Sequence, residues 1–255
     1  MAKKNIWIIC NYASPPKYAS FGFRQFFFAK ELNSLGHKTL IISSSFSQYM
    51  YDYPRLKRSF TKENIEGVDF LWVKTNKYNN PHSFGRILNW IIFTIKCIFI
   101  NTKGNIKPDI IYCSVPSHIS FLACVFLKLR FPKVKVHLEV RDIWPLTLIE
   151  IGNKSKYNPM ILVLRLIEKI SYKFSDTIIG TMPLLNEHIK SSISSKFQYH
   201  YIPQGIDLNF MSKSKNFDYN DFFNLPKDKF IVGYAGSISI ANALETLIKA
   251  ANDIE

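Results

Sequence analysis

The chain has 255 residues, of which 47% are hydrophobic and 20% charged, and 33 basic residues against 19 acidic ones give a formal charge of +14. This apolar share excludes extensive disorder and is ample for a hydrophobic core. The positive charge favours polyanionic partners such as phosphate-bearing substrates or an anionic membrane surface. Because the basic residues are scattered and most aromatic residues fall in apolar runs, a nucleic-acid partner is not expected.

Apolar runs and helical patterns alternate along the first 202 residues. The pattern predicts strands at 5–12, 39–43, 68–74, 109–114, 134–140, 176–181 and 199–202. It predicts helices at 21–35, 87–100, 117–130, 158–174 and 184–191. This order is typical of an α/β fold with a doubly wound parallel sheet.

Several helix ends carry specific signals. Gly36 follows the first helix as a stop, Ser117 is a candidate cap, and Asn158 followed by Pro159 is a typical helix start. In the helix at 158–174 we expect one inner face and an outer face that holds the basic residues. The expected inner residues are Val163, Ile167, Ile170 and Phe174, and the expected outer residues are Arg165, Lys169 and Lys173.

The helix predicted at 87–100 is apolar on most sides, although Asn89, Thr94 and Lys96 interrupt it. It is too short to span a bilayer, and no other segment has about 20 uninterrupted apolar residues. One interpretation is a buried crossover helix. The alternative is a helix that leans on lipid, with Trp90 at the level of the headgroups.

The four cysteines are far apart, and no C-x-x-C motif occurs. We expect buried free thiols in a reducing compartment. They are Cys10, Cys97, Cys113 and Cys124.

The last part of the chain suggests a second unit. Residues 1–210 would form an amino-terminal domain, the polar segment 211–228 a linker, and 229–255 the start of a second domain. That start consists of an expected strand at 230–234 and a helix with an apolar face. The face contains Leu244, Leu247, Ile248 and Ala251.

Ligands of open α/β sheets bind beyond the carboxyl ends of the strands, so the loops there contain the candidate site residues. After the first strand, Gly22 could let a phosphate or sugar approach the backbone, and Lys17 and Arg24 could add positive charge. The alternative is an ordinary loop with a glycine at a helix start. The dinucleotide fingerprint and the P-loop are both absent.

After the fifth predicted strand, Glu139, Arg141 and Asp142 cluster, followed by Trp144. Such charges are costly at the end of an apolar strand unless they are paired or meet a ligand. Arg141 could bind phosphate or carboxylate, and Asp142 could orient a hydroxyl or accept its proton. The alternative is a structural pair of Arg141 with Asp142.

Near the end of the chain, Gly236 and Ser237 lie between the expected strand and helix and would suit a diphosphate. The histidines show no metal-ligand cluster, so no metal or other cofactor is expected. His118 and His137 are expected to be hydrogen-bonded structural residues.

These segments together resemble the retaining GT-B glycosyltransferases of glycosyltransferase family four, in particular bacterial enzymes of O-antigen and capsule synthesis. The resemblance rests on residues 11–44, on RDIWP (141–145), on IPQGID (202–207) and on residues 233–251. It implies an amino-terminal Rossmann-like acceptor domain and a second Rossmann-like domain, here incomplete, for a nucleotide-sugar donor. Where many relatives have His-Asp, this chain has Arg141-Asp142, and its first loop is less rich in glycine.

The resemblance further implies transfer of a sugar with retained anomeric configuration and without a metal. The donor would be a UDP-sugar. The acceptor would be a saccharide or a polyprenyl-diphosphate-linked sugar, and the protein would lie peripherally on the inner face of the cytoplasmic membrane. Asp142 and Arg141 are the expected catalytic residues, with Gly22, Lys17, Arg24, Glu139, Trp144, Gly236 and Ser237 binding substrate.

Two other functions stay open. The chain could be a non-catalytic lobe that binds a lipid-linked sugar or needs a partner subunit. It could also be a Rossmann-like NAD enzyme, although the missing glycine fingerprint argues against this.

Overall fold

The computed structural model describes residues 2–20, 22–80, 83–102, 107–115, 118–205, 207–208, 212, 225–226, 228–236, 238 and 240–253. Its core is an eight-stranded sheet with the order β3-β4-β2-β1-β5-β6-β7-β8. The strands are β1 (Asn5–Ile9), β2 (Lys38–Ser44), β3 (Phe60–Ile65), β4 (Val68–Val73), β5 (Ile110–Val115), β6 (Lys135–Val140), β7 (Thr177–Gly180) and β8 (Tyr199–Tyr201). All neighbouring strands are parallel except β3 and β4, so the predicted α/β fold is confirmed with one antiparallel edge strand.

The edge strand β3 was not predicted from the sequence. It is paired on one side only and is largely polar, so it lacks the apolar run of the inner strands. It turns into β4 through Glu66 and Gly67, whose φ angles of 48° and 82° lie in the left-handed region. Such a turn is typical of a two-residue hairpin, so the pair Glu66-Gly67 was the sequence signal from which β3 could have been predicted.

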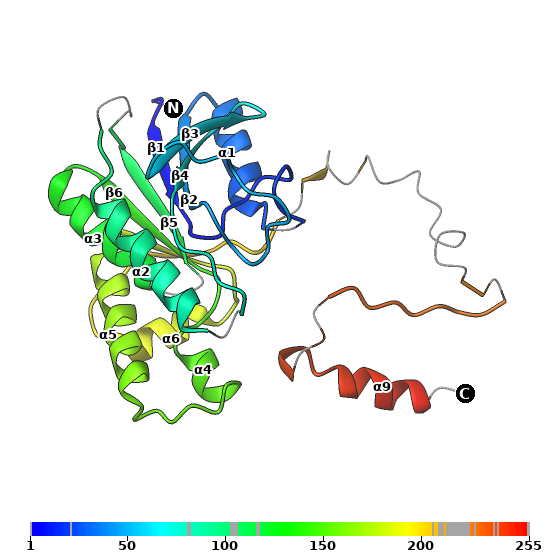
Figure 1. Cartoon of the computed structure of the whole chain (residues 1–255). Helices are drawn as coiled ribbons and strands as arrows, with labels where there is room; N and C mark the ends of the chain where they lie inside the picture. Colours follow the sequence, from blue (N-terminus) through cyan, green and yellow to red (C-terminus); the bar gives the residue numbers. More distant parts are fainter. Residues whose placement is uncertain are drawn as a thin grey trace.

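The helices cover the two faces of the sheet unequally (Figure 1). Helix α1 packs on one face, where Phe26 and Ala29 join a core cluster with Phe70 and Trp72. The other face is covered by the helices α2, α3, α5 and α6. The helices are α1 (Arg24–Ser34), α2 (Phe84–Ile98), α3 (Phe121–Arg130), α4 (Leu146–Glu150), α5 (Pro159–Phe174), α6 (Leu185–Ser192) and α9 (Leu244–Asn252).

Two predicted helix ends are confirmed. The Asn158 side chain accepts a hydrogen bond from the Met160 backbone N–H at 2.9 Å, and Pro159 opens α5. Gly36 follows α1 with φ of 86°, a conformation that disfavours residues with a Cβ. Ser117 lies outside the described residues.

The prediction for the faces of α5 is wrong in part. Val163 and Phe174, expected inside, are 57% and 46% exposed, whereas the buried residues include Leu164 and Tyr172. Apolar residues lie on both sides of this helix, so their spacing alone did not fix which side meets the sheet. The outer side of α5 is therefore partly apolar.

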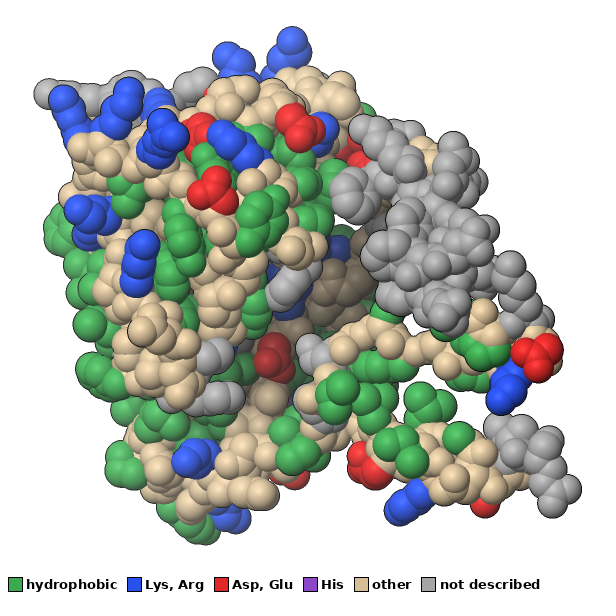
Figure 2. Space-filling model, turned by 45° about the vertical axis from the view of Figure 1, so that its right-hand side comes forward, with side chains coloured by type: hydrophobic (Ala, Val, Ile, Leu, Met, Phe, Trp, Pro, Cys, Tyr) green, Lys and Arg blue, Asp and Glu red, His purple; other side chains and the backbone are tan. Residues whose placement is uncertain are grey.

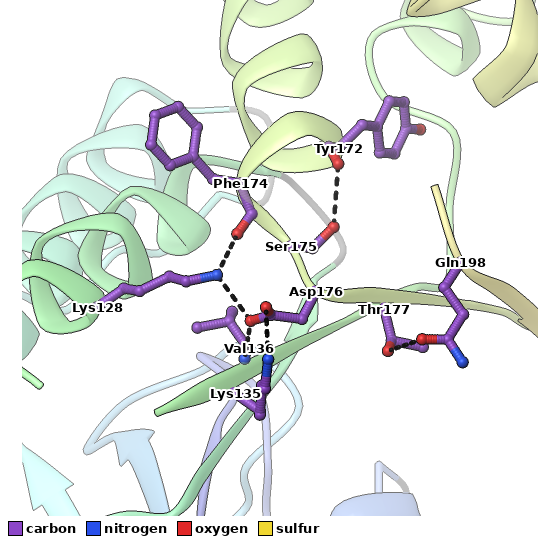
Figure 3. Close-up of polar contacts among 9 residues, drawn as sticks. All are labelled: Lys128, Lys135, Val136, Tyr172, Phe174, Ser175, Asp176, Thr177 and Gln198. Carbon is purple, nitrogen blue, oxygen red and sulfur yellow. Dashed lines mark hydrogen bonds and ion pairs between the residues drawn. The ribbon is translucent and has the colours of Figure 1, made fainter. Parts of the chain in front are cut away.

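Asp176, at the start of β7, ties three elements together (Figure 3). Its carboxylate accepts hydrogen bonds from Lys128 of α3 at 2.7 Å and from the Val136 backbone N–H of β6 at 2.8 Å. Partial burial raises the pKa of this carboxyl, but the Lys128 and Val136 donors outweigh burial and leave the pKa below its ordinary value. The contact fixes α3 against the sheet edge from which the chain enters β7.

The four cysteines are buried and free, as predicted. None of the helices in the described part of the chain is long and apolar enough to cross a membrane. The segment 230–234 is not a strand, since it pairs with no strand among the residues that the structure describes. Helix α9 has no buried residue, and most of the proposed linker at 211–228 lies outside the described residues.

Candidate functional site

A buried polar network fastens the loop after β1 to helix α2. The Asn11 amide donates to Asn89 Oδ1 at 3.2 Å, and the Asn89 amide donates to Thr75 Oγ1 at 2.9 Å. The Trp90 indole N–H donates to the Tyr12 hydroxyl at 2.7 Å. Trp90 is only 3% exposed, so the alternative that it sits at the level of lipid headgroups is wrong.

A cavity of about 650 Å³ lies beside α1, on the side of the sheet that this helix covers. Gly22, Arg24 and Arg141 line it together with Tyr112 of β5 and Gln204. Gly22 has φ of 91°, which favours glycine, and lies just before Phe23, the N-cap residue of α1. The surface of the molecule is visibly hollowed on the side shown in Figure 2, with basic and acidic side chains set back in the hollow.

Glu139 lies beneath this cavity and is fully buried. Its carboxylate accepts hydrogen bonds from Arg24 Nε at 2.7 Å, from the Ser114 hydroxyl at 2.5 Å and from the Gln25 amide at 3.4 Å. Burial lowers the pKa of Arg24, but the nearby carboxylate outweighs burial and leaves that pKa raised. Glu139 thus holds Arg24 in place at the cavity wall.

Arg141 differs from Arg24 because it has no ion pair among the described residues. Its Nε is buried without a hydrogen-bond partner, and the expected alternative, a pair with Asp142, is not formed. The two side chains lie apart, since Arg141 lines the cavity beside α1 whereas Asp142 is bonded to Trp144 and Thr147 on the α2 side. An arginine at a cavity wall whose guanidinium has a buried and unpartnered N–H is suited to bind an anionic ligand.

Asp142 lies on the α2 side, just beyond the carboxyl end of β6. Its two oxygens accept hydrogen bonds from the Trp144 indole N–H at 2.9 Å and from the Thr147 hydroxyl at 2.7 Å. The Trp144 ring meets the Trp90 ring edge-to-face, with centroids 5.5 Å apart. The carboxylate is therefore held rigidly, as a group that orients a substrate hydroxyl must be.

His118 lies in the short 3₁₀ turn His118–Ser120 before α3 and is 2% exposed. Neither ring nitrogen has a hydrogen-bond partner among the residues that the structure describes, which contradicts the expectation that this histidine is hydrogen-bonded. The ring instead packs edge-to-face on Tyr172, with centroids 5.2 Å apart. Burial lowers the pKa of His118 to about 4, so the ring is neutral at pH 7.

Two of the remaining predicted site residues, Lys17 and Gly236, do not line the cavity. The Lys17 ammonium pairs with Glu63 of the edge strand β3 at 2.6 Å. Gly236 is exposed, and a Cβ there would collide with the Tyr234 ring. Ser237 lies outside the described residues. Within the described part of the chain, no three His, Cys, Asp or Glu side chains are placed to hold a metal ion.

Three residues of the site were missed from the sequence. Gln25 and Ser114 are buried partners of Glu139, and Tyr112 lines the cavity. Burial, and then the nearby Glu139 charge, raises the pKa of Tyr112 far above its ordinary value, so its hydroxyl stays protonated. The available signal was Ser114, a polar residue near the end of an apolar strand that pairs with the strand of Glu139.

No family model matches the chain, and no curated protein matches it either. Several solved structures do. Sucrose-phosphate synthase from Thermosynechococcus elongatus is similar at 15% identity and a TM-score of 0.70, over 99% of this chain and 60% of that protein. HepE from Anabaena, in complex with UDP and glucose, is similar at 12% identity and a TM-score of 0.58, over 100% and 59%.

A third structure is an E. coli protein described as trehalose-6-phosphate bound with UDP-2-fluoro glucose. It is similar at 9% identity and a TM-score of 0.54, over 86% of this chain and 53% of that one. The chain thus spans at most about three fifths of the length of these proteins. At these identities the likeness shows the fold, and the chain has the Rossmann-like α/β fold of GT-B glycosyltransferases.

Proposed function

We propose that the chain is the acceptor-side part of a retaining glycosyltransferase that transfers a hexosyl or N-acetylhexosaminyl group from a UDP-sugar. The acceptor is a saccharide or a polyprenyl-diphosphate-linked sugar in bacterial surface polysaccharide synthesis, such as that of O-antigen or capsule. The protein works on the cytoplasmic side, attached peripherally to the inner face of the membrane. No metal or other cofactor takes part in this proposal.

The observation that carries the proposal is the pair of side chains at the end of β6. Arg141 lines the cavity with a buried Nε that has no partner, and Asp142 is held by Trp144 and Thr147 on the other side of the strand. The carboxyl ends of strands are where α/β sheets bind ligands. Two of the structures with this fold were solved with UDP or a UDP-sugar analogue.

In this proposal the residues act by position and charge. Arg141 attracts the phosphate or carboxylate of the acceptor, and Arg24, fixed by Glu139, adds positive potential to the same cavity. Asp142 orients the acceptor hydroxyl and takes its proton. Gly236 and Ser237, before α9, face the diphosphate of the donor when the second domain closes, and the helix start stabilises the departing UDP.

The test is transfer by the full-length natural protein, supplied with a panel of UDP-sugars and with saccharide or polyprenyl-diphosphate acceptors. Product is detected by mass spectrometry, and the configuration of the new linkage by NMR. We expect transfer with retention, and loss of transfer in Asp142→Ala with the fold intact. If native protein transfers nothing but binds the lipid-linked acceptor, the alternative of a non-catalytic lobe is the better account.

A further inference from the structure

The two side chains that bond Asp142 belong to the same short segment of the chain as Asp142 itself. Trp144 donates to one carboxylate oxygen at 2.9 Å, and Thr147 donates to the other at 2.7 Å. Helix α4, which begins two residues after Trp144, has no buried residue and lies at the margin of the molecule (Figure 1). These two hydrogen bonds therefore fix the carboxylate within its segment, but they do not by themselves fix the segment against the rest of the protein.

The segment meets helix α2 through the Trp144 ring. Ile143 packs against the core cluster on this face of the sheet and Pro145 is buried, so the backbone of the segment is held near the sheet. The Trp144 ring packs edge-to-face on Trp90 of α2, with an interplanar angle of 84°. Because the Trp144 indole N–H donates to Asp142, the orientation of this ring sets where the carboxylate lies.

Trp90 is itself locked in place by two neighbours. It is buried, and its indole N–H donates to the Tyr12 hydroxyl at 2.7 Å. The Arg86 guanidinium lies 4.8 Å from the centre of the Trp90 ring, and Arg86 Nε donates to the same Tyr12 hydroxyl at 3.1 Å. A cation over the ring and a hydrogen bond at its edge together hold the indole in one orientation. Trp90 is therefore a rigid base on which the Trp144 ring rests.

We propose that Trp90 is a positioning residue for Asp142 and acts through Trp144. The inference rests on the proposed function, in which Asp142 orients the acceptor hydroxyl and takes its proton. A proton acceptor must lie within hydrogen-bond reach of that hydroxyl, and a misplacement of about 1 Å can lower the rate ~10²-fold. Trp90 is buried and bonds no substrate in this account, so its loss lowers turnover rather than donor binding.

Steady-state kinetics of the full-length natural protein test the effect on turnover. Trp90→Leu should lower kcat ~10-fold or more and leave the KM for the UDP-sugar within about twofold, because only the orientation of Asp142 changes. Trp90→Phe keeps a ring on which Trp144 packs, so it should retain kcat within about threefold. Phe93→Leu is the matched control, since Phe93 lies on the same helix and is fully buried in the core. It should lower stability but leave kcat within about twofold of native protein.

A second measurement reports the hydrogen bond between Trp144 and Asp142 without any sugar. Hydrogen exchange of the indole N–H groups is followed in ¹H–¹⁵N spectra, and Trp144→Phe identifies the Trp144 signal. Trp90→Leu should speed exchange at Trp144 ~10-fold or more, because the bond to Asp142 opens more often. The Trp72 indole, which donates to Glu63 at 2.8 Å, should exchange as in native protein. That comparison separates local release of Trp144 from a general loss of stability.

The two measurements give distinct outcomes. Unchanged exchange at Trp144 in Trp90→Leu, or equal losses of kcat in Trp90→Leu and Phe93→Leu, would overturn the inference. Faster exchange at Trp144 in a protein whose native form transfers no sugar would support the anchoring of Asp142 through Trp90. That result would refute the proposed function instead.

Discussion

Replacing Arg24 by Met tests the buried ion pair beneath the cavity. Glu139 is fully buried, and Arg24, 2.7 Å away, is the one cation that pairs with it among the described residues. The variant leaves the carboxylate with neutral hydrogen-bond donors, which include Ser114 and Gln25. An uncompensated buried charge costs ~3–5 kcal/mol of the free energy of unfolding. We take the lower end, about 3 kcal/mol, because two neutral donors stay in place.

The assay is urea unfolding followed by circular dichroism, with Glu139→Gln and the double variant for comparison. Glu139→Gln should cost less, about 1–2 kcal/mol, because the Arg24 side chain is 18% exposed and can turn to water. The double variant should be more stable than Arg24→Met alone, because it contains no buried charge. A loss below ~0.5 kcal/mol in Arg24→Met, or strict additivity in the double variant, would refute this reasoning.

Three further predictions concern stability. His118 has a pKa of about 4 in the folded protein against 6.5 when unfolded, so its contribution to the free energy of unfolding is complete above pH 6.5 and is lost as the pH falls toward 4. The free energy of unfolding of native protein should therefore fall by about 2 kcal/mol more between pH 7.5 and 5 than that of His118→Leu. Equal pH dependence of the two proteins would contradict the argument. Asp176→Asn replaces the carboxylate shared by α3 and β6 with a neutral amide that has one accepting oxygen in place of two, and it should cost about 1–2 kcal/mol in urea unfolding. Glu66→Gln, in an exposed pair with Lys30, should cost less than ~0.5 kcal/mol. Equal costs would show that the charge of Asp176 adds nothing. Gly22→Ala should lower the free energy of unfolding by about 1 kcal/mol because φ of 91° strains a residue with a Cβ, and an unchanged melting temperature would show that the loop relaxes at no cost.

The sequence predicted the inner strands and most helices because burial on both faces leaves continuous apolar runs, and Asn158 and Gly36 mark helix ends through local chemistry. The edge strand β3 was not predicted because a strand that is paired on one side needs no apolar run. The strand expected at 230–234 has no neighbour to pair with. Local pattern cannot supply the pairing partner that decides whether a segment becomes a strand.

For the site, the sequence singled out Glu139, Arg141 and Asp142 because charges are unusual at the end of an apolar strand. It did not reveal that Glu139 takes Arg24 as its partner, 115 positions away, while Arg141 has no ion pair within the described part of the chain. It also placed Lys17 in the site, although Lys17 pairs with Glu63. Such assignments depend on which side of a strand faces which helix, and the topology of the whole sheet decides that.

The central claim is that the cavity beside α1 receives the acceptor through Arg141. The most direct measurement is steady-state kinetics of the full-length protein and its Arg141→Met variant, with donor and acceptor varied separately. The account predicts that the KM for the acceptor rises ~10-fold or more while the KM for the UDP-sugar is unchanged, because a charge-assisted contact to the acceptor is lost. A rise in the donor KM alone, or kinetics unchanged for both substrates, would contradict it.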